Sequence, residues 1–169
     1  SISGYVGADV VSDVLVSGMY RRGGLSMLID IGTNGEVVLG NGDAMLSASC
    51  AAGPALEGAE VAFGMRGMAG AIERVAINAE SHEVFYRTIG NERPRGICGS
   101  GLVDAMASLR VAGLLDQTGR MRAGGQTARP EFVIARAADT DIGKDITITQ
   151  RDIRNLQLAK AAIFTGCSL

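Results

Sequence analysis

Hydrophobic and polar positions along this chain follow first a helical period and then short strand-like runs, and clusters of glycine separate them. Between residues 7 and 19 apolar side chains recur at helical spacing, which predicts a helix. From residue 25 to residue 49, three short apolar runs are separated by GTNG at 32–35 and GNGD at 40–43. Asn-Gly between apolar runs is typical of hairpins, so residues 25–49 predict a three-stranded antiparallel meander with two tight turns.

The rest of the chain predicts further helices and strands. Pro54 and the early Glu57 predict a helix start in ALEGAEVAF, with Glu57 and Glu60 on one solvated face. Residues 117–130 are rich in Gly, Arg and Thr and predict an irregular exposed loop. The other predicted elements are a hairpin (72–77 and 83–89), an amphipathic helix (102–115), two strands (132–137 and 146–149) and a helix (150–164) capped by Thr149. This order favours an α/β class, with helices packed on a mixed sheet.

Composition limits the function classes. Of the 169 residues 47% are hydrophobic and 20% are charged, which is typical of a packed globular domain. The net charge of −2, with no Trp and 4% aromatics, disfavours binding to nucleic acid or to an anionic membrane. Without a signal peptide or a membrane-spanning apolar run, a cytoplasmic location is expected. The chain begins with Ser and stops just after an apparent helix, which predicts a fragment of a longer protein.

The cysteines and the histidine offer no metal site. Cys50, Cys98 and Cys167 are widely spaced, and no CxxC pair is present. All three stand among small or apolar neighbours, which predicts buried free thiols in a reducing compartment. His82, the single histidine, lies in a polar stretch and is expected in a solvated loop.

Asp30 ends an apolar run and precedes a glycine-rich turn, and two explanations of it remain open. It could accept hydrogen bonds from the turn at 32–35 as an Asx-type cap. Alternatively, the glycines could let backbone N–H groups approach phosphate while Asp30 holds Mg²⁺ through water. In the second case Thr33 and Asn34 would add polar contacts.

Three further segments carry the same kind of ambiguity. The run GICGSG at 96–101 opens a helix, so Gly99, Ser100 and Gly101 predict either an anion site or a Ser100 N-cap with glycines for close packing. The loop at 50–54 brings Gly53 to the start of another predicted segment. Asp9 lies at a helix start, where an acidic side chain is favourable in any case.

Four segments together resemble the ATP-dependent reductive activators of corrinoid proteins. They are LIDIGTNGEVVLGN (28–41), CAAGPALEGA (50–59), GMRGMAGAIERV (64–75) and GICGSGLVDA (96–105). The resemblance extends over essentially the whole chain, through ITQRDIRNLQLAKAAI (148–163). It implies the acetate and sugar kinase, Hsp70 and actin superfamily, in which each half of the ATPase core has a ribonuclease H-like fold with an antiparallel meander.

The resemblance also implies roles for particular residues. Asp30 to Thr33 is similar to the second phosphate motif, and Asp9 stands where sugar kinases place a catalytic aspartate. By this resemblance Asp30 and Asp9 are the catalytic residues, and Asp30 holds Mg²⁺ through water. The residues expected to contact ATP are Gly32, Thr33, Asn34, Gly35, Gly53, Gly99, Ser100 and Gly101.

For the whole protein the resemblance implies coupling of ATP hydrolysis to reduction of a Co(II) corrinoid to Co(I) on a partner protein. Residues 1–169 would then be one partial domain, with the first ATPase lobe and an iron–sulfur cluster in the missing part. The fragment alone is expected not to hydrolyse ATP at a useful rate. A homodimer is compatible with the resemblance. The alternatives are a small-molecule kinase lobe with Asp9 as general base, and a non-catalytic partner-binding lobe.

Overall fold

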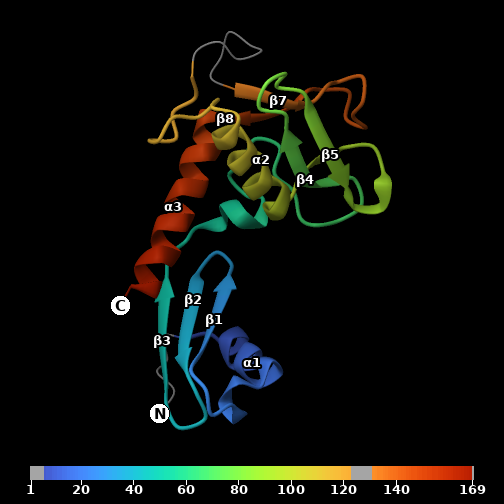
Figure 1. Cartoon of the computed structure of the whole chain (residues 1–169). Coiled ribbons are helices and arrows are strands. Elements are labelled where there is room, and N and C mark those ends of the chain that lie inside the picture. Colours follow the sequence, from blue (N-terminus) through green and yellow to red (C-terminus); the bar gives the residue numbers. More distant parts are fainter. Residues whose placement is uncertain (1–5, 123–130, 169) are drawn as a thin grey trace. The chain divides into compact units, whose positions relative to one another are not determined.

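The computed structural model describes residues 6–122 and 131–168. The chain divides into two compact units, which are described here one at a time (Figure 1). Unit 1 consists of residues 1–53 and 158–169, and unit 2 consists of residues 54–157. Among the helices of the described residues, none has both the length and the apolar character needed to cross a lipid bilayer.

Unit 1 contains the predicted meander. Its elements are α1 (Ala8–Ser17), a 3₁₀ turn η1 (Met19–Arg21), β1 (Ser26–Ile31), β2 (Gly35–Gly40) and β3 (Met45–Cys50). The strands pair antiparallel in the order β1-β2-β3, so the prediction for residues 25–49 is confirmed. The predicted helix at 7–19 is also confirmed, and it ends at Gly18, whose φ of +67° suits a residue without a side chain.

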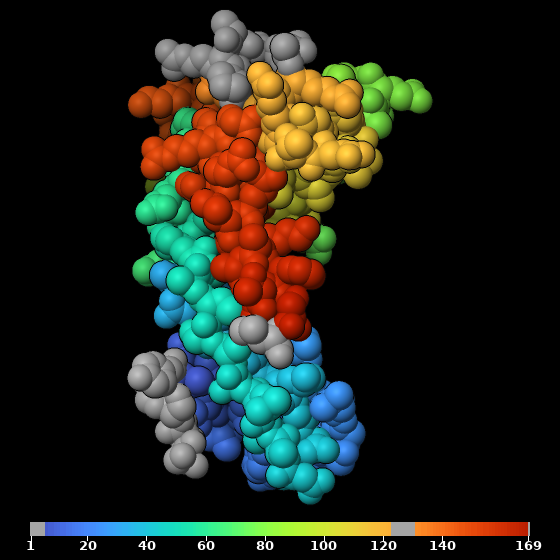
Figure 2. All heavy atoms as spheres, turned by 90° about the vertical axis from the view of Figure 1, so that its left-hand side faces the viewer, coloured from blue at the N-terminus to red at the C-terminus, as the bar shows by residue number. Residues whose placement is uncertain are grey.

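The two faces of this sheet have different neighbours. On one face Leu28 of β1 and Val38 of β2, which pair directly, pack with Val10 of α1. The opposite face includes Gly35 and Val37, and the last part of α3 (Gln150–Cys167) packs on them within unit 1. Figure 2 shows the side chains of β3 at the surface, in cyan, in agreement with the exposure of most of this strand.

Unit 2 contains the remaining strands and α2. β4 (Ala71–Ile77) lies between β5 (Val84–Thr88), which is antiparallel to it, and β6 (Gly96–Ile97), which is parallel to it. The predicted hairpin is therefore confirmed, and this sheet is mixed. β7 (Glu131–Ala135) and β8 (Ile146–Thr149) form a separate antiparallel pair. The core of the unit gathers apolar side chains from these strands, from α2 (Gly99–Val111) and from the start of α3.

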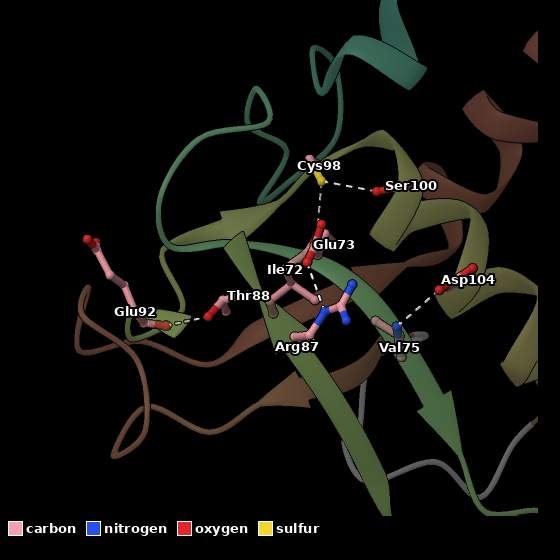
Figure 3. Close-up of polar contacts among 9 residues, drawn as sticks. All are labelled: Ile72, Glu73, Val75, Arg87, Thr88, Glu92, Cys98, Ser100 and Asp104. Atoms are coloured by element: carbon pink, nitrogen blue, oxygen red, sulfur yellow. Dashed lines mark hydrogen bonds and ion pairs between the residues drawn. The ribbon is translucent and has the colours of Figure 1, made fainter. Parts of the chain in front are cut away.

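One edge of β4 is completed by a helix in place of a strand. The backbone N–H of Val75 donates to Asp104 of α2 at 3.4 Å (Figure 3). The carbonyl of the same residue accepts from the Ser108 hydroxyl at 3.2 Å. Because buried backbone groups are costly when unpaired, two side chains one helical turn apart here take over the function of a neighbouring strand.

The first turn of α3 confirms the predicted cap. The Thr149 hydroxyl accepts from the Asp152 N–H at 3.2 Å, and the Asp152 carboxylate accepts from the Thr149 N–H at 2.8 Å. This reciprocal arrangement is a capping box with aspartate at its third position. The helix runs from Gln150 to Cys167, somewhat longer than the predicted 150–164.

The helix predicted after Pro54 is wrong. Only a 3₁₀ turn, η2 (Pro54–Glu57), forms there, and Glu57 and Glu60 therefore do not share a helical face. Gly58 has φ +85° and Glu60 has φ +60°, values that interrupt a right-handed helix. A side chain on Gly58 would stand 2.6 Å from the Met65 nitrogen, so close packing with the residues that follow the predicted helix fixes this turn. Of the loop expected at 117–130, residues 123–130 lie outside the described residues.

Candidate functional site

The connection between β1 and β2 is the centre of the candidate site. Residues 32–34 join the two strands, and Gly35 already belongs to β2, directly opposite Ile31. The Thr33 carbonyl accepts a hydrogen bond of 2.8 Å from the Gly53 N–H. The loop is thus held from outside by the segment that follows β3, which leaves little freedom for its central residue.

Gly35 has a packing reason to lack a side chain. A Cβ built on Gly35 would stand 2.8 Å from Ile163 Cγ1 and 3.6 Å from the Ala52 Cβ. Gly35, the glycine of the Asn-Gly pair, therefore allows α3 to pack closely on β2. The hairpin turn is formed by the residues before it. Its role toward phosphate stays a prediction.

Carboxylates gather beside the end of β1. Asp30 is partly buried on the sheet face that carries α1, and Asp9 and Asp13, four residues apart on that helix, act on it electrostatically. Burial, the charge of Asp13, a hydrogen bond with Asp13 and the charge of Asp9 together raise the pKa of Asp30 above its ordinary value. Negative charges close together are unfavourable, so a cation or a proton near Asp30 stabilises this arrangement.

Glu36 is a further carboxylate that sequence reasoning missed. It is 5% exposed, lies directly opposite Asp30 in the β1–β2 register and accepts a hydrogen bond of 3.0 Å from the Ser49 hydroxyl. In the sequence it begins an apolar run and carries no sign of burial. Asp13 was missed as well, although its spacing of four residues from Asp9 could have indicated a shared helix face.

Asp9 stays at the start of α1 as predicted. Its carboxylate accepts a hydrogen bond of 2.9 Å from the Val10 N–H, and the side chain is exposed. The carboxylate folds back over Gly7, where an added Cβ would meet it. An exposed carboxylate at this place is free to contact a water molecule or a substrate hydroxyl.

The residues present fit Mg²⁺ held through water better than a direct multidentate site. Among the described residues, no three His, Cys, Asp or Glu side chains lie close enough to hold a metal ion together. Mg²⁺ usually keeps several waters and takes one or two carboxylates plus substrate phosphates. A single partly buried carboxylate at Asp30, surrounded by other negative charge, meets that requirement.

The glycine-rich helix start belongs to unit 2. Side chains on Gly99 and Gly101 would each stand 2.1 Å from a backbone oxygen, of Leu56 and Ile72 respectively. Close packing accounts for both glycines. Ser100 as the N-cap is wrong, because the N-cap is Cys98 and no side chain caps the helix. Ser100 is exposed within the first turn, 3.4 Å from the Cys98 sulfur (Figure 3).

The structure therefore brings some of the predicted residues together. Asp30, Asp9 and the loop at 32–35 lie in unit 1, and Gly53 supports the loop through its N–H group. Gly99, Ser100 and Gly101 form part of unit 2, where the backbone N–H groups of the first turn of α2 have no partner within the helix. Their contact with a nucleotide stays a prediction.

Comparisons with known proteins agree on one family. The family described as "C-terminal domain of RACo the ASKHA domain" matches residues 24–169. The corrinoid activation enzyme RamQ of Eubacterium limosum is 43% identical over 99% of this chain and 30% of its own length. The [Co(II) methylated amine-specific corrinoid protein] reductase of Methanosarcina barkeri is 27% identical over 83% of this chain and 30% of its own length.

A solved structure confirms the fold. A reductive activator for corrinoid, iron–sulfur protein superposes with a TM-score of 0.92 and is 46% identical, over 97% of this chain and 27% of that one. The mixed α/β class expected from the sequence is thereby confirmed. The chain spans about 30% of the length of the curated relatives that it matches.

Proposed function

This chain belongs to the family of the C-terminal ASKHA domain of RACo, and from this premise we propose that it forms the phosphate-holding part of an ATP-dependent activator that reduces Co(II) corrinoid to Co(I) on a partner protein. The single observation that carries the proposal is the carboxylate of Asp30 beside a glycine-rich loop in a chain of this family. The relatives' names describe corrinoid activation and corrinoid protein reduction, which supports the reaction and the partner.

In this proposal the loop positions phosphate. The anchored Thr33 carbonyl fixes the course of the backbone. The N–H groups of Gly32 and Gly53 donate to the Asn34 and Thr33 carbonyls, so they shape the loop. Thr33 and Asn34 contribute polar groups, and the Asp30 carboxylate accepts hydrogen bonds from water around Mg²⁺. Bound MgATP would supply the free energy of phosphoanhydride hydrolysis.

Asp9 orients the attacking water. Its carboxylate is exposed at the start of α1, and the neighbouring Val10 N–H holds one of its oxygens. The other oxygen can accept a proton or a hydrogen bond from water, the usual contribution of a general base. A kinase would use the same carboxylate on a substrate hydroxyl, so the reaction product distinguishes the two functions.

We place the iron–sulfur chemistry outside these residues. Cys98 is buried in unit 2, where its thiol lies 3.4 Å from the Ile72 carbonyl, while Cys50 and Cys167 belong to unit 1. A cluster takes four ligands from one neighbourhood, whereas this chain has three free cysteines, of which Cys98 is buried, Cys50 partly buried and Cys167 exposed. The activator therefore receives its electron from another part of the longer protein.

The test uses the intact protein with a Co(II) corrinoid protein and a strong reductant. ATP hydrolysis and the corrinoid spectrum are followed together, and ATP-dependent appearance of Co(I) is the expected result. Asp30→Asn is expected to abolish both, whereas the control Asp43→Asn, in the exposed turn between β2 and β3, changes neither. Hydrolysis without a spectral change would reject the corrinoid reaction, and phosphorylated product would establish a kinase.

A further inference from the structure

The hairpin of β4 and β5 presents an exposed face with an unusual pair of charges. Arg74 lies directly opposite Arg87, and Ala76 lies directly opposite Phe85. Directly opposite residues point to the same face of a sheet, and all four of these residues are exposed. We call this set the hairpin face. The other face of β4 carries Val75, which is buried in the core of unit 2.

The two arginines of the hairpin face differ in their partners. Arg87 forms an ion pair of 2.9 Å with Glu73, at an irregularity in the β4–β5 register (Figure 3). Arg74 forms no ion pair with any residue from 6–122 or 131–168. The ion pair with Glu73 offsets the charge of Arg87, whereas the charge of Arg74 has no ion-pair partner among these described residues.

The stability of the hairpin does not explain why position 74 carries an arginine. Like charges directly opposite each other destabilise an antiparallel pair, whereas an acidic residue at position 74 would form a favourable cross-strand pair with Arg87. Arginine is also poorly replaced by lysine where two planar donors must meet a carboxylate. The charge at position 74 therefore needs an explanation outside the hairpin.

Phe85 adds an apolar anchor between these charges and the turn. Its side chain is 55% exposed, which leaves most of an aromatic ring in contact with water. Arginine and aromatic residues are the types enriched in the centres of protein–protein interfaces. A chain with net charge −2 has no long-range field for nucleic acid, so a protein surface fits this patch better.

We propose that the hairpin face docks an acidic surface of the corrinoid-carrying partner, with Arg74 and Arg87 binding carboxylates and Phe85 covering an apolar neighbour. This inference rests on the proposed function and names the surface through which that function reaches its partner. Electrostatic complementarity of this kind raises the association rate and makes binding depend on salt. The hairpin belongs wholly to unit 2, whereas the phosphate loop belongs to unit 1. Arg74, Arg87 and Phe85 are exposed, and none of them is among the residues expected to contact ATP, so their substitution is expected to leave ATP binding unchanged.

The decisive variant is Arg74→Glu in the intact protein. The probes are the methylated amine-specific corrinoid protein and the corrinoid iron–sulfur protein, each in its Co(II) form, with affinity measured at low and high salt. Loss of a central arginine contact is expected to weaken binding of the recognised probe roughly thirtyfold. The thermal stability is expected to stay equal or rise, because the new carboxylate faces Arg87. ATP hydrolysis without partner is expected to stay unchanged.

Two further variants sharpen the test. Arg151→Glu makes the same change of charge at an exposed position of α3 and is expected to bind the probe as the wild type does. Phe85→Ser removes the anchor without a change of charge and is expected to weaken binding roughly tenfold at both salt concentrations.

Three results would overturn the docking surface. Equal affinity of the wild type and Arg74→Glu would reject it and leave the proposed function standing. Binding of neither probe by the wild type would reject the partner, and the docking surface with it. A change in self-association on sedimentation, with probe binding unchanged, would assign the hairpin face to contacts between two copies of this protein.

Discussion

Ile163 of α3 occupies the space that a side chain on Gly35 would need. A Cβ on Gly35 would stand 2.8 Å from Ile163 Cγ1, closer than real Cβ atoms approach a neighbour. One residue ends the candidate phosphate loop and the other lies in the last turns of a helix, both within unit 1. The position of the loop and the position of this part of α3 therefore depend on each other.

Gly35→Ala is expected to destabilise the protein by about 1–3 kcal/mol, the usual cost of adding a methyl group to a filled space. Ile163→Ala removes the colliding Cγ1, so the double variant should lose less than the sum of the two single losses. Urea unfolding of the four proteins gives the coupling. Gly23→Ala, where an added Cβ meets nothing within 4 Å, is the control. Simple additivity would contradict the contact.

Local signals in the sequence were sufficient for the meander. Asn41 and its neighbours form a turn closed by their own backbone and side chain, with the Asn41 carboxamide oxygen accepting from the Asp43 N–H at 2.9 Å. Such contacts lie within a few residues, so the sequence pattern contains them. The capping box of Thr149 and Asp152 was predictable in part for the same reason.

The features that the sequence did not reveal depend on contacts outside the segments from which they were predicted. The helix predicted after Pro54 is interrupted at Gly58 and Glu60, which have positive φ, and Gly58 packs against Met65, which lies just beyond the ALEGAEVAF segment. Glu36 is buried because β2 lies in the middle of the meander and Ser49 hydrogen-bonds to it, which requires the strand register. The packing role of Gly99 likewise requires knowledge of where Leu56 lies.

The stability of the protein is expected to fall as the pH rises through the raised pKa of Asp30. The folded state binds this proton more tightly than the unfolded state, whose value is the ordinary 3.8. The stabilising contribution is therefore complete below pH 3.8 and is lost as the pH rises through the folded pKa. Asp30→Asn should remove this dependence and be more stable than the wild type near neutral pH. Urea midpoints between pH 3 and pH 8 measure it.

Asp116 provides a control of opposite sign for that experiment. Hydrogen bonds from the Thr118 side chain and from the backbone of Arg120 and Thr118 lower its pKa. Its contribution is therefore present above pH 3.8 and lost as the pH falls through the folded pKa. If Asp116→Asn and Asp30→Asn changed the pH profile in the same direction, the assignment of Asp30 would be wrong.

Asp152 is expected to be one of the most sensitive positions in unit 2. It is 1% exposed, and its carboxylate accepts hydrogen bonds from the Ala62 N–H at 3.0 Å and from the Thr149 N–H and hydroxyl, each at 2.8 Å. Asp152→Ala leaves these donors without a partner and should cost about 3 kcal/mol. Asp152→Asn keeps one acceptor oxygen and should cost less. Thermal unfolding of both variants tests the order.

The start of α2 allows packing and nucleotide binding to be separated, because Gly99 and Ser100 are neighbours with different surroundings. Gly99→Ala would drive a Cβ to 2.1 Å from the Leu56 carbonyl oxygen, a backbone atom that cannot turn aside. This variant should lose about 3 kcal/mol of stability. Ser100 is exposed, and within residues 6–122 and 131–168 its hydroxyl is hydrogen-bonded only to the Cys98 sulfur, so Ser100→Ala should change stability by less than about 0.5 kcal/mol.

If Ser100 contacts nucleotide, Ser100→Ala should bind ATP roughly fivefold more weakly, the effect of one lost hydrogen bond, at unchanged stability. Titration calorimetry on the intact protein, beside its thermal unfolding, measures both quantities. A matched control is Ser108→Ala, which removes a hydroxyl that donates to the Val75 carbonyl and should lower stability without affecting nucleotide affinity. Unchanged ATP affinity in Ser100→Ala would leave the glycines at 99 and 101 with their packing role alone, and would confine the nucleotide contacts of this chain to the loop beside Asp30.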